Sequence, residues 1–582
     1  MPTQTLEGAQ ALVKCLESEG VEYIFGYSGG AAIPIFDALV TTENNIEFVL
    51  VRHEQGAVHM ADGYARATGK PAVVLVTSGP GATNTLTGIM TAHMDSVPMI
   101  VISGQAVSWM LGKDAFQEAD IFGITMPVVK HSYLVKETND IPRITREAFH
   151  IATTGRPGPV LIDIPKDVSA GPFTGDLRAE MDLPGYTLHT EICNDTVLEI
   201  AEAIAKAQRP LILAGHGAMI SQADDELLAL AEKGNIPVTT TLLGKGIFPE
   251  SHRLSLGMLG MHGTAYANKA VCECDLILNV GSRFDDRILG QPDKFCRNAT
   301  IIHIDIDAAE VGKMIQPQIT CVGDAKAVLT ELIKHVPTRE HKAWNRHLDG
   351  YRKNFPLTFK RQGGLKMQHV IDEFYKQTEG LACVSTDVGQ HQMWAAQFYK
   401  NERRYDWLSS GGAGTMGFGF PASIGAAFGR PDDIHICFVG DGGFQMTFFE
   451  LATAAIHKFP VKIVVLNNHY LGMVRQWQEL FYDDRKSGVD LEGNPDFAKL
   501  AESFGVKAYN LRRPGDVKRV VATALAYNDG PCLINCEVEK TDNVYPMVPA
   551  GAALEAMITE APTHKMEKPT GSTEGEHHDT DR

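Results

Sequence analysis

Two nearby stretches, DIHICFVGDGGFQM (433–446) and VKIVVLNN (461–468), decide the fold. Each contains an unbroken run of apolar residues, which is typical of a strand covered on both faces of a parallel sheet. Each run ends at glycine or a small polar residue, and 24 residues separate Gly442 from Asn467, enough for one helix and the second strand. The pattern predicts two adjacent parallel strands, whose carboxyl ends meet at one sheet edge.

Asp441 and Asn468 are expected to lie together at this edge. A carboxylate and an amide oxygen suit a hard cation such as Mg²⁺, which keeps few protein ligands and shares its coordination sphere with phosphates. Gly440, Gly442 and Gly443 would let the backbone approach a diphosphate closely. Either dipeptide alone would be interpreted as turn residues after a strand. Both together, on successive strands, favour a phosphate and metal site.

The same alternation of short apolar runs and helix-length segments recurs along the chain and predicts an α/β protein with three doubly wound parallel-sheet domains. The other predicted strands lie in 71–84, 97–105, 209–217, 274–284 and 299–307. We place the domains at 1–170, 190–335 and 365–545, with a C-terminal lid and a disordered tail in 546–582. The segments 168–192 and 338–364 are expected to be linkers, because the first is rich in glycine, proline and charge and follows a strand signal, and the second holds many charges and no strand signal.

Composition excludes several classes of function. The 582 residues include 53 Lys and Arg against 71 Asp and Glu, a net charge of −18. Nucleic acid and anionic membranes would be repelled by such a field, so neither is an expected partner. No apolar run approaches the length of a membrane span.

The ten cysteines are scattered along the chain and lack the paired spacing of a zinc site. Most lie within apolar runs, as buried free thiols do, so a reducing compartment is expected. The first twenty residues carry three glutamates and no apolar core, so they resemble neither a signal nor a transit peptide. A cytoplasmic location is expected.

A glycine–aspartate–glycine turn followed by 24 residues and two asparagines resembles the diphosphate-binding motif of thiamine diphosphate (ThDP) enzymes. An ordered set of further blocks resembles the FAD-containing acetohydroxyacid synthase catalytic large subunits, also called acetolactate synthases, from about residue 4 to 560. The blocks are FGYSGGA (25–31), RHEQGAVHMADGYARATG (52–69), DAFQE (114–118), GRPGPVLIDIPKDV (155–168), LGMHGTA (259–265), GSRFDDR (281–287), GQHQMWAAQ (389–397), GTMGFGFPA (414–422), LGMVRQWQ (471–478) and PMVPAGAAL (546–554).

The resemblance implies a pyrimidine-binding first domain, a central FAD-binding domain and a diphosphate-binding third domain. Glu54 matches the glutamate that hydrogen-bonds the aminopyrimidine ring and helps to move its proton; without the neighbouring blocks, it would be interpreted as a surface acid in the first turn of a helix. Gly414 and Met416 match residues that hold ThDP bent. Other matches are Val388, Gly389, Gln390 and His391 around the diphosphate, and Asp441, Asn468 and the Tyr470 carbonyl around Mg²⁺.

In the middle domain, the resemblance implies that FAD is bound by Gly260, Met261, His262, Gly263, Arg283, Asp286, Asp305 and Asp324. The sequence Arg-Phe-Asp-Asp-Arg (283–287) carries most weight, because FAD-free relatives generally lack it. The flavin of this family performs no net redox work in the main reaction, so its role here would be structural or vestigial.

The resemblance also implies the reaction: decarboxylation of pyruvate and transfer of the two-carbon fragment to pyruvate or 2-oxobutyrate, as in branched-chain amino-acid biosynthesis. Arg287 would hold the carboxylate of the second 2-oxo acid; its alternative is a surface ion pair with Asp285 or Asp286. Trp477 and Met473 would shape the pocket of the second substrate. Gly29, Gly30, Phe116, Gln117 and Lys166 match residues of the active-site channel.

A homodimer or tetramer with the site between chains, and a separate small regulatory subunit, follow from the same resemblance. The nearest alternative is another ThDP decarboxylase or carboligase, either pyruvate oxidase-like or a catabolic FAD-free acetolactate synthase. A catalytically inactive cofactor-binding protein is a further alternative, although Glu54, Asp441 and Asn468 are all present. A nicotinamide dehydrogenase fits worse, because no GxGxxG opens the first predicted helix.

Overall fold

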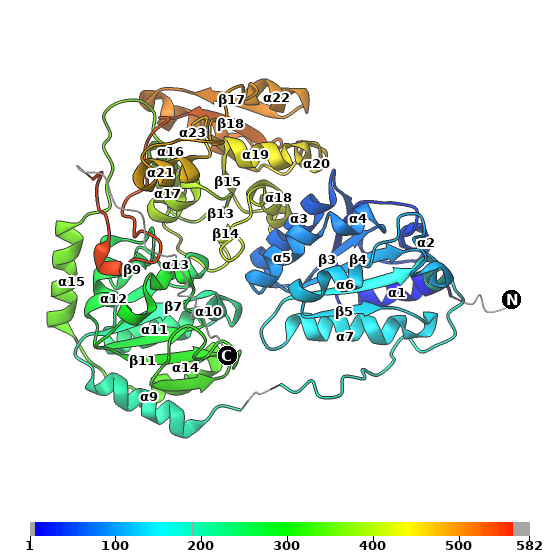
Figure 1. Ribbon diagram of the computed structural model, residues 1–582, viewed down its shortest axis with the longest axis horizontal. Coiled ribbons are helices and arrows are strands. Elements are labelled where there is room, and N and C mark those ends of the chain that lie inside the picture. Colours follow the sequence, from blue (N-terminus) through cyan, green and yellow to red (C-terminus); the bar gives the residue numbers. More distant parts are fainter. Residues whose placement is uncertain (1–5, 189–190, 563–582) are drawn as a thin grey trace, which may run out of the picture.

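The computed structural model describes residues 6–188 and 191–562, and it contains three six-stranded sheets, all of them parallel (Figure 1). This confirms the predicted α/β class. The predicted disordered tail falls largely on 563–582, outside the described residues. No helix within the described ranges is long and apolar enough to cross a membrane.

The first sheet has the strand order β2-β1-β3-β4-β6-β5. Its strands are β1 (Tyr23–Gly26), β2 (Glu47–Leu50), β3 (Ala72–Val76), β4 (Met99–Gln105), β5 (His131–Leu134) and β6 (Pro159–Pro165). The helices around it are α1 (Gly8–Ser18), α2 (Ile33–Thr41), α3 (Glu54–Thr68), α4 (Pro80–Thr83), α5 (Leu86–Met94), α6 (Ile121–Thr125), α7 (Ile141–Thr153) and α8 (Lys166–Ser169).

The middle sheet has the order β12-β11-β10-β7-β8-β9. Counted within the sheet this is 6-5-4-1-2-3, the strand order of dinucleotide-binding sheets. Its strands are β7 (Pro210–Ala214), β8 (Val238–Thr240), β9 (Ser255–Met258), β10 (Leu276–Val280), β11 (Thr300–Asp305) and β12 (Ile319–Val322). Its helices are α9 (Asn194–Lys206), α10 (His216–Ile220), α11 (Asp224–Gly234), α12 (Ala265–Glu273), α13 (Asp286–Leu289) and α14 (Ala325–His335).

The third sheet has the order β14-β13-β15-β16-β18-β17, which repeats the topology of the first. Its strands are β13 (Cys383–Thr386), β14 (Trp407–Ser409), β15 (His435–Gly440), β16 (Lys462–Asn467), β17 (Lys507–Leu511) and β18 (Cys532–Glu537). Its helices are α16 (Met367–Thr378), α17 (Gln390–Phe398), α18 (Gly419–Gly429), α19 (Asp441–Thr447), α20 (Leu451–His457), α21 (Gly472–Phe481), α22 (Phe497–Ser503) and α23 (Val517–Ala526).

Central strands are apolar throughout because both of their faces are covered. On β3, Val74 and Val76 belong to one core cluster, whereas Val73 and Leu75 belong to another on the opposite face of the sheet. Successive side chains of a strand point to opposite faces, so a strand between two helical layers needs an apolar residue at every position.

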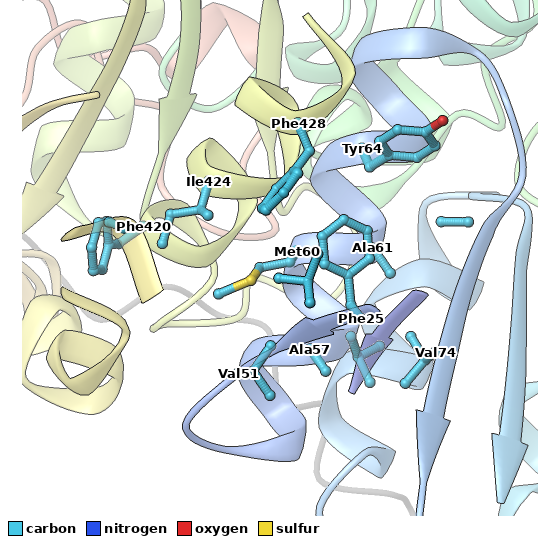
Figure 2. Close-up of a cluster of buried hydrophobic side chains, with 14 of the residues drawn as sticks. Phe25, Val51, Ala57, Met60, Ala61, Tyr64, Val74, Phe420, Ile424 and Phe428 are labelled. Carbon is cyan, nitrogen blue, oxygen red and sulfur yellow. The ribbon is translucent and has the colours of Figure 1, made fainter. Parts of the chain in front are cut away.

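Helices α3 and α18 lie between the first and third sheets and join them into one core. Figure 2 shows Met60 and Tyr64 of α3 beside Ile424 and Phe428 of α18, within a cluster that also holds Phe25 of β1. Two glycines permit this close approach. A Cβ on Gly63 would lie 2.0 Å from the carbonyl oxygen of Ala422, and a Cβ on Gly425 would lie 1.8 Å from that of Met60.

A buried carboxylate fixes the start of α3 against the third domain. Oε1 of Glu450 accepts hydrogen bonds from the backbone N–H groups of Arg52 (3.0 Å) and His53 (3.2 Å), and Oε2 accepts one from Thr453. Burial raises the pKa of Glu450, while these donors oppose the rise. The orientation of α3 is thus set at its first turn as well as at its centre.

The segment 338–364, expected to be a linker, instead contains a helix that packs against the middle domain. It contains α15 (Lys342–Asn354), whose Trp344 and Leu348 are buried against the middle domain. The indole Nε1 of Trp344 donates to the carbonyl of Pro210 at 3.1 Å. The helix was not predicted because most of its residues are charged or polar and only one narrow apolar face is buried.

We predict that Gly63→Ala destabilises the protein by about 1–3 kcal/mol, because the new methyl group meets a backbone carbonyl that no rotamer change can move. The measurement is the urea midpoint of unfolding. Gly350→Ala on α15 is the control: its Cβ would meet nothing within 4 Å, so we expect a gain of about 0.5–1 kcal/mol from helix propensity. An unchanged midpoint for Gly63→Ala would show that the two helices can separate at no cost.

Candidate functional site

The point where the third sheet reverses its strand order carries most of the predicted diphosphate and metal residues. The chain turns to opposite sides of β13 to form β14 and β15, and ligands of doubly wound sheets bind at such points. Asp441 directly follows β15, and Asn468 directly follows β16, its hydrogen-bonded parallel neighbour. The predicted juxtaposition of these two strand ends is confirmed.

Asp441 is held by a residue that sequence reasoning missed. Nδ2 of Asn494 donates to Oδ2 of Asp441 at 2.7 Å and to Oδ1 of Asn467 at 3.3 Å. Burial raises the pKa of Asp441 to about 6, and the Asn494 hydrogen bond opposes the rise. Nothing in the sequence around Asn494 suggested this contact, which depends on the loop after α21 folding back over β15.

One carboxylate, one amide oxygen and one backbone carbonyl are available to a cation here. Oδ1 of Asn468 accepts from the backbone N–H of Tyr470 at 3.2 Å, and Asp441, Asn468 and Tyr470 all line the same cavity. Within the described ranges, no group of three or more His, Cys, Asp or Glu could hold a metal ion. The donor set therefore suits a hard cation that completes its sphere with phosphate and water.

The glycines before and within α19 form a surface without room for side chains. A Cβ on Gly440 would lie 2.9 Å from Cε1 of His391, and one on Gly443 would lie 2.4 Å from Oδ2 of Asp387. His391 is buried, and its Nε2 has no hydrogen-bond partner among the described residues. Burial lowers its pKa to about 3, so the imidazole is neutral. An unpartnered nitrogen beside a glycine cradle fits a polar ligand group.

Asp387 fixes the segment that carries Gly414 and Met416. Its carboxylate accepts from the backbone N–H groups of Gly417 (2.9 Å) and Val388 (2.7 Å), and burial raises its pKa to about 7. Gly414 has φ +63, a conformation that favours glycine. Gly414 and Met416 both face the cavity.

The cavity has a volume of about 1070 Å³ and continues from the third domain into the middle domain. It reaches the point where the middle sheet reverses its strand order, between β7 and β10. The predicted residues that line it are Met261, His262, Arg283, Arg287, Asp305 and Asp324 on the middle-domain side, and Val388, Gly389, Gln390, His391, Gly414, Met416, Gly440, Asp441, Gly442, Gly443, Asn468, Tyr470, Met473 and Trp477 on the other.

Three predicted middle-domain residues lie just outside the cavity. Gly260 and Gly263 shape the turn that presents Met261 and His262: a Cβ on Gly260 would lie 2.6 Å from the carbonyl oxygen of Arg287. The side chain of Asp286 is 71% exposed and pairs with Arg287 at 3.6 Å. Its neighbour Asp285 lines the cavity instead.

The carboxylate of Asp324 is already engaged in local structure. Oδ1 caps α14 by accepting from the backbone N–H of Ala327 at 3.0 Å, and Oδ2 accepts from Ser221 at 2.7 Å. Asp305 similarly accepts from the N–H of Asp307 at 2.9 Å. His262 is buried and neutral, since burial lowers its pKa to about 4, and its Nδ1 has no partner among the described residues.

Sequence reasoning missed three further residues that line the middle-domain side: Asp95, Arg156 and His216. Arg156 pairs with Glu310 at 2.6 Å and with Asp307 at 3.3 Å. It lies in the block GRPGPVLIDIPKDV, so a signal was present but was not assigned to it. Asp95 and His216 come from different domains and lie 121 positions apart, and no sequence pattern indicated that Nδ1 of His216 lies 2.8 Å from the carbonyl oxygen of Asp95.

The predicted residues of the first domain gather elsewhere, around the turn after β3. Nδ2 of Asn84 donates to Oε2 of the buried Glu54 at 3.0 Å. A Cβ on Gly29 would lie 2.5 Å from Thr77, and a Cβ on Gly79 would lie 2.8 Å from the carbonyl oxygen of Gln117.

This group does not line the cavity of its own chain. Phe116 is 90% exposed, and Gly30, Gln117 and Lys166 are exposed as well. A single chain thus presents two separate groups of predicted site residues, one on the first domain and one lining the cavity of the other two domains.

Comparisons with known proteins agree with the three-sheet architecture. Residues 6–124 match the N-terminal TPP binding domain of thiamine pyrophosphate enzymes, 197–332 the central domain, and 387–536 the C-terminal TPP binding domain. The chain is 47% identical over 562 residues to the acetolactate synthase large subunit of Pyropia yezoensis, covering 95% of each chain. It is 45% identical over 566 residues to that of Haemophilus influenzae, covering 96% of this chain and 99% of the relative. Similarity at this level, over nearly the full length and all three domains, shows that the chain belongs to the thiamine pyrophosphate enzymes and, within them, to the acetolactate synthase large-subunit family.

Proposed function

We propose that this protein is an acetolactate synthase that uses ThDP, Mg²⁺ and FAD. It decarboxylates pyruvate and joins the two-carbon fragment to a second 2-oxo acid, pyruvate or 2-oxobutyrate, giving 2-acetolactate or 2-aceto-2-hydroxybutyrate. The observation that carries the proposal is the strand-order reversal of the third sheet, where Asp441, Asn468 and the glycines of α19 line one cavity. ThDP, when bound, supplies the electron sink that decarboxylation of a 2-oxo acid requires.

The third domain would hold the diphosphate and its cation. Asp441, Asn468 and the carbonyl of Tyr470 would bind Mg²⁺, and the closely packed glycines would admit phosphate oxygens to the backbone. Asp387 would keep Met416 against the ring system by holding the N–H of Gly417. Each of these residues positions a charged or apolar part of the cofactor before substrate arrives, which lowers the cost of reorganisation during the reaction.

The middle domain would hold FAD. Its strand order is that of dinucleotide-binding sheets, and the cavity there presents the guanidinium groups of Arg283 and Arg156 as well as the unpartnered Nδ1 of His262. Guanidinium groups suit a dinucleotide phosphate. As expected for this family, we assign the flavin a structural role.

Arg287 would bind the carboxylate of the second substrate. Its side chain is 61% exposed and lines the cavity, and its 3.6 Å pair with Asp286 is at the surface and therefore weak. The guanidinium can exchange this partner for a substrate carboxylate. Trp477 and Met473, on the adjacent α21, would limit the size of the second substrate.

A second copy of the chain would complete the site. Glu54 would hold a proton at the aminopyrimidine ring, yet it does not line the cavity of its own chain. The cavity is not lined by Phe116, Gln117, Lys166, Gly29 or Gly30 either. We therefore propose a homodimer, or a tetramer built from such dimers, in which the first domain of one chain covers the cavity of its partner.

The relatives are named large subunits, which supports our proposal that this chain has a separate small regulatory subunit. All ten cysteines are free, which supports a cytoplasmic location.

The test is acetolactate formation from pyruvate by the purified, cofactor-stripped chain, measured as acetoin after acid decarboxylation. We expect product only when ThDP, Mg²⁺ and FAD are all returned. Activity without FAD would favour the catabolic relative, and acetaldehyde or acetate would indicate a decarboxylase or an oxidase. A folded chain that binds ThDP and yields no product, with or without a small subunit, would contradict the proposal.

Glu54→Gln should lower turnover by about 10²–10⁴-fold at saturating ThDP, because the amide cannot take part in proton transfer. The steady-state rate of acetolactate formation is the measurement. Glu43→Gln, an exposed glutamate on the same domain, is the matched control and should keep the wild-type rate. Full activity of ThDP-saturated Glu54→Gln would remove Glu54 from the mechanism.

Asn494→Leu should raise the Mg²⁺ concentration needed for half-maximal activity by about 10–100-fold, since it deletes the donor that orients the Asp441 carboxylate. Glu492→Gln, at an exposed position of the same loop, should leave this requirement unchanged. If Asn494→Leu shows the wild-type Mg²⁺ dependence, then either the Asp441 carboxylate keeps its orientation without the Asn494 hydrogen bond, or Asp441 is not a cation ligand.

A further inference from the structure

A buried charged cluster lies where the first domain meets the other two, and the proposed reaction makes no use of it. Asp62 and Arg66 are on α3 and Asp95 directly follows α5, and all three side chains are almost fully buried. Nη2 of Arg66 donates to Oδ2 of Asp95 at 2.8 Å, and Nε of Arg66 donates to Asp62. Although burial alone would lower it, the pKa of Arg66 is raised by the two carboxylates. A single guanidinium donates to two buried carboxylates, so the remaining carboxylate lone pairs need further hydrogen-bond donors.

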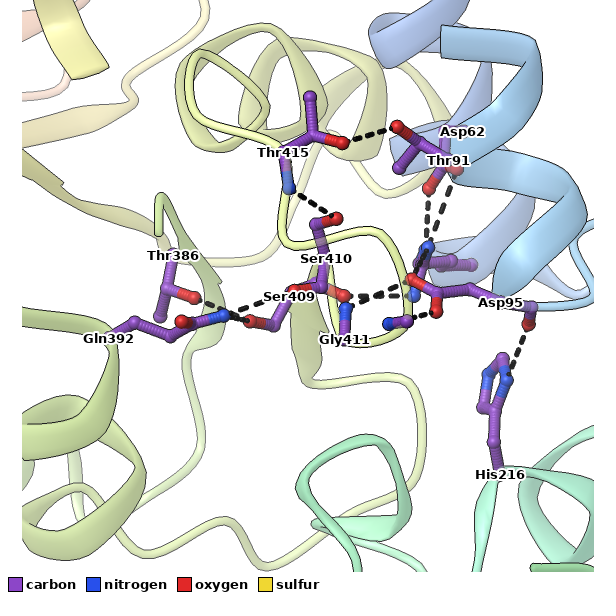
Figure 3. A network of polar contacts seen from close by, with 12 residues as sticks. Asp62, Thr91, Asp95, His216, Thr386, Gln392, Ser409, Ser410, Gly411 and Thr415 are labelled. Carbon is purple, nitrogen blue, oxygen red and sulfur yellow. Dashed lines mark hydrogen bonds and ion pairs between the residues drawn. The ribbon is translucent and has the colours of Figure 1, made fainter. Parts of the chain in front are cut away.

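Backbone N–H groups of the third domain supply those donors. Oδ1 of Asp95 accepts from Gly412 at 2.7 Å, and Oδ2 accepts from Gly411 at 3.1 Å. Nη1 of Arg66 donates in turn to the carbonyl of Ser409 at 3.0 Å. Figure 3 shows Asp95 facing the loop that carries Gly411. The cluster thus holds the start of the segment 409–416, which connects β14 to the turn before α18.

Other polar contacts hold the rest of this segment. Nε2 of Gln392 donates to Oγ of Ser409 at 2.8 Å and to the carbonyl of Ser410 at 3.2 Å. The hydroxyls of Thr91, on α5, and Thr415 are 2.6 Å apart (Figure 3). Beyond Ser409, the last residue of β14, the segment contains three glycines and no helix or strand, so its ordering is entropically costly and depends on these contacts.

The segment 409–416 lies between the two parts of the cavity. On the third-domain side it presents Gly414 and Met416. On the middle-domain side, a Cβ on Gly412 would lie 2.7 Å from Nη2 of Arg283, and Nδ1 of His216 is 2.8 Å from the backbone carbonyl oxygen of Asp95. Burial lowers the pKa of His216 to about 4, so it is neutral and donates this hydrogen bond. Arg283 therefore lies beside the same backbone segment that carries Gly414 and Met416, and His216 contacts Asp95, which holds that segment.

We propose that Asp95, held by Arg66, is a positioning residue that fixes the segment 409–416 and thereby couples dinucleotide binding in the middle domain to ThDP binding in the third. The inference rests on the proposed function, because that function assigns the two ligands. A dinucleotide bound at Arg283 and His216 orders the face of the segment that Asp95 contacts, so less ordering remains for ThDP to impose at Met416. By linkage, ThDP strengthens dinucleotide binding by the same factor.

The test measures ThDP affinity by titration calorimetry at saturating Mg²⁺, on the full-length cofactor-stripped chain, with and without FAD. For the wild type, we expect FAD to lower the ThDP dissociation constant by at least about 5-fold, the low end of typical couplings. Asp95→Asn should reduce the effect of FAD to less than about twofold, because the amide cannot accept from both backbone N–H groups and Arg66 at once.

Thr91 provides a test outside the charged cluster, which remains valid if Asp95→Asn does not fold. Thr91→Val removes the hydroxyl that meets Thr415 while keeping the side-chain shape, and it should at least halve the effect of FAD. Thr91→Ser keeps the hydroxyl and should retain the full effect. A cluster that only stabilises the fold would change the unfolding midpoint of these variants without changing the effect of FAD on ThDP affinity.

Two results would overturn the inference. One is a wild-type ThDP affinity that FAD changes by less than twofold, and the other is Thr91→Val with the full effect of FAD. In both cases ThDP binding and acetolactate formation would persist, so the proposed function would stand. If the wild-type chain binds neither ThDP nor FAD, the proposed function and the inference fail together.

Discussion

The close crossing of α3 and α18 is the contact on which the rest of the architecture depends. Gly63 and Gly425 bring the two helix backbones so near that side chains from both sheets form one continuous core. Each helix is also adjacent to a functional segment: α3 begins at Glu54, and α18 follows the turn that carries Gly414 and Met416. Packing at this crossing therefore sets the relative orientation of the two groups of predicted site residues, and Glu450 reinforces it at the first turn of α3.

This orientation keeps the two groups of predicted site residues apart within one chain. The first and third sheets share a strand order, and each has its own point of reversal. The reversal of the third sheet faces the middle domain across the cavity, whereas that of the first sheet, near Glu54 and Gln117, lies outside it. The shared core fixes both sheets, and Glu54 lies outside the cavity that Met416 lines. The proposed dimer follows from this constraint as much as from the family relationship.

Two sets of buried or partly buried ion pairs lie where domains meet. The Asp62, Arg66 and Asp95 cluster bridges the first domain to the loop after β14, and Arg156 bridges it to Glu310 of the middle domain. Buried ion pairs contribute little net stability, since desolvation offsets their attraction, but breaking one is costly. Such pairs make the relative placement of domains specific, while the apolar cores supply most of the stabilisation.

Local patterns in the sequence predicted central strands such as β3, β15 and β16, the α/β class and the edge at which Asp441 and Asn468 meet. Those features follow from the period of apolar residues and from the geometry of parallel strands, both of which are local. Tertiary structure alone decided the contacts of Asn494 with Asp441 and of Asp95 with Gly412, because each joins loops from distant parts of the chain. It also revealed α15, whose single narrow apolar face was hidden by charge, and it placed Asp285 rather than Asp286 at the cavity. Sequence periodicity specifies which residues are buried within an element, whereas the direction of a loop side chain depends on the packing of whole domains.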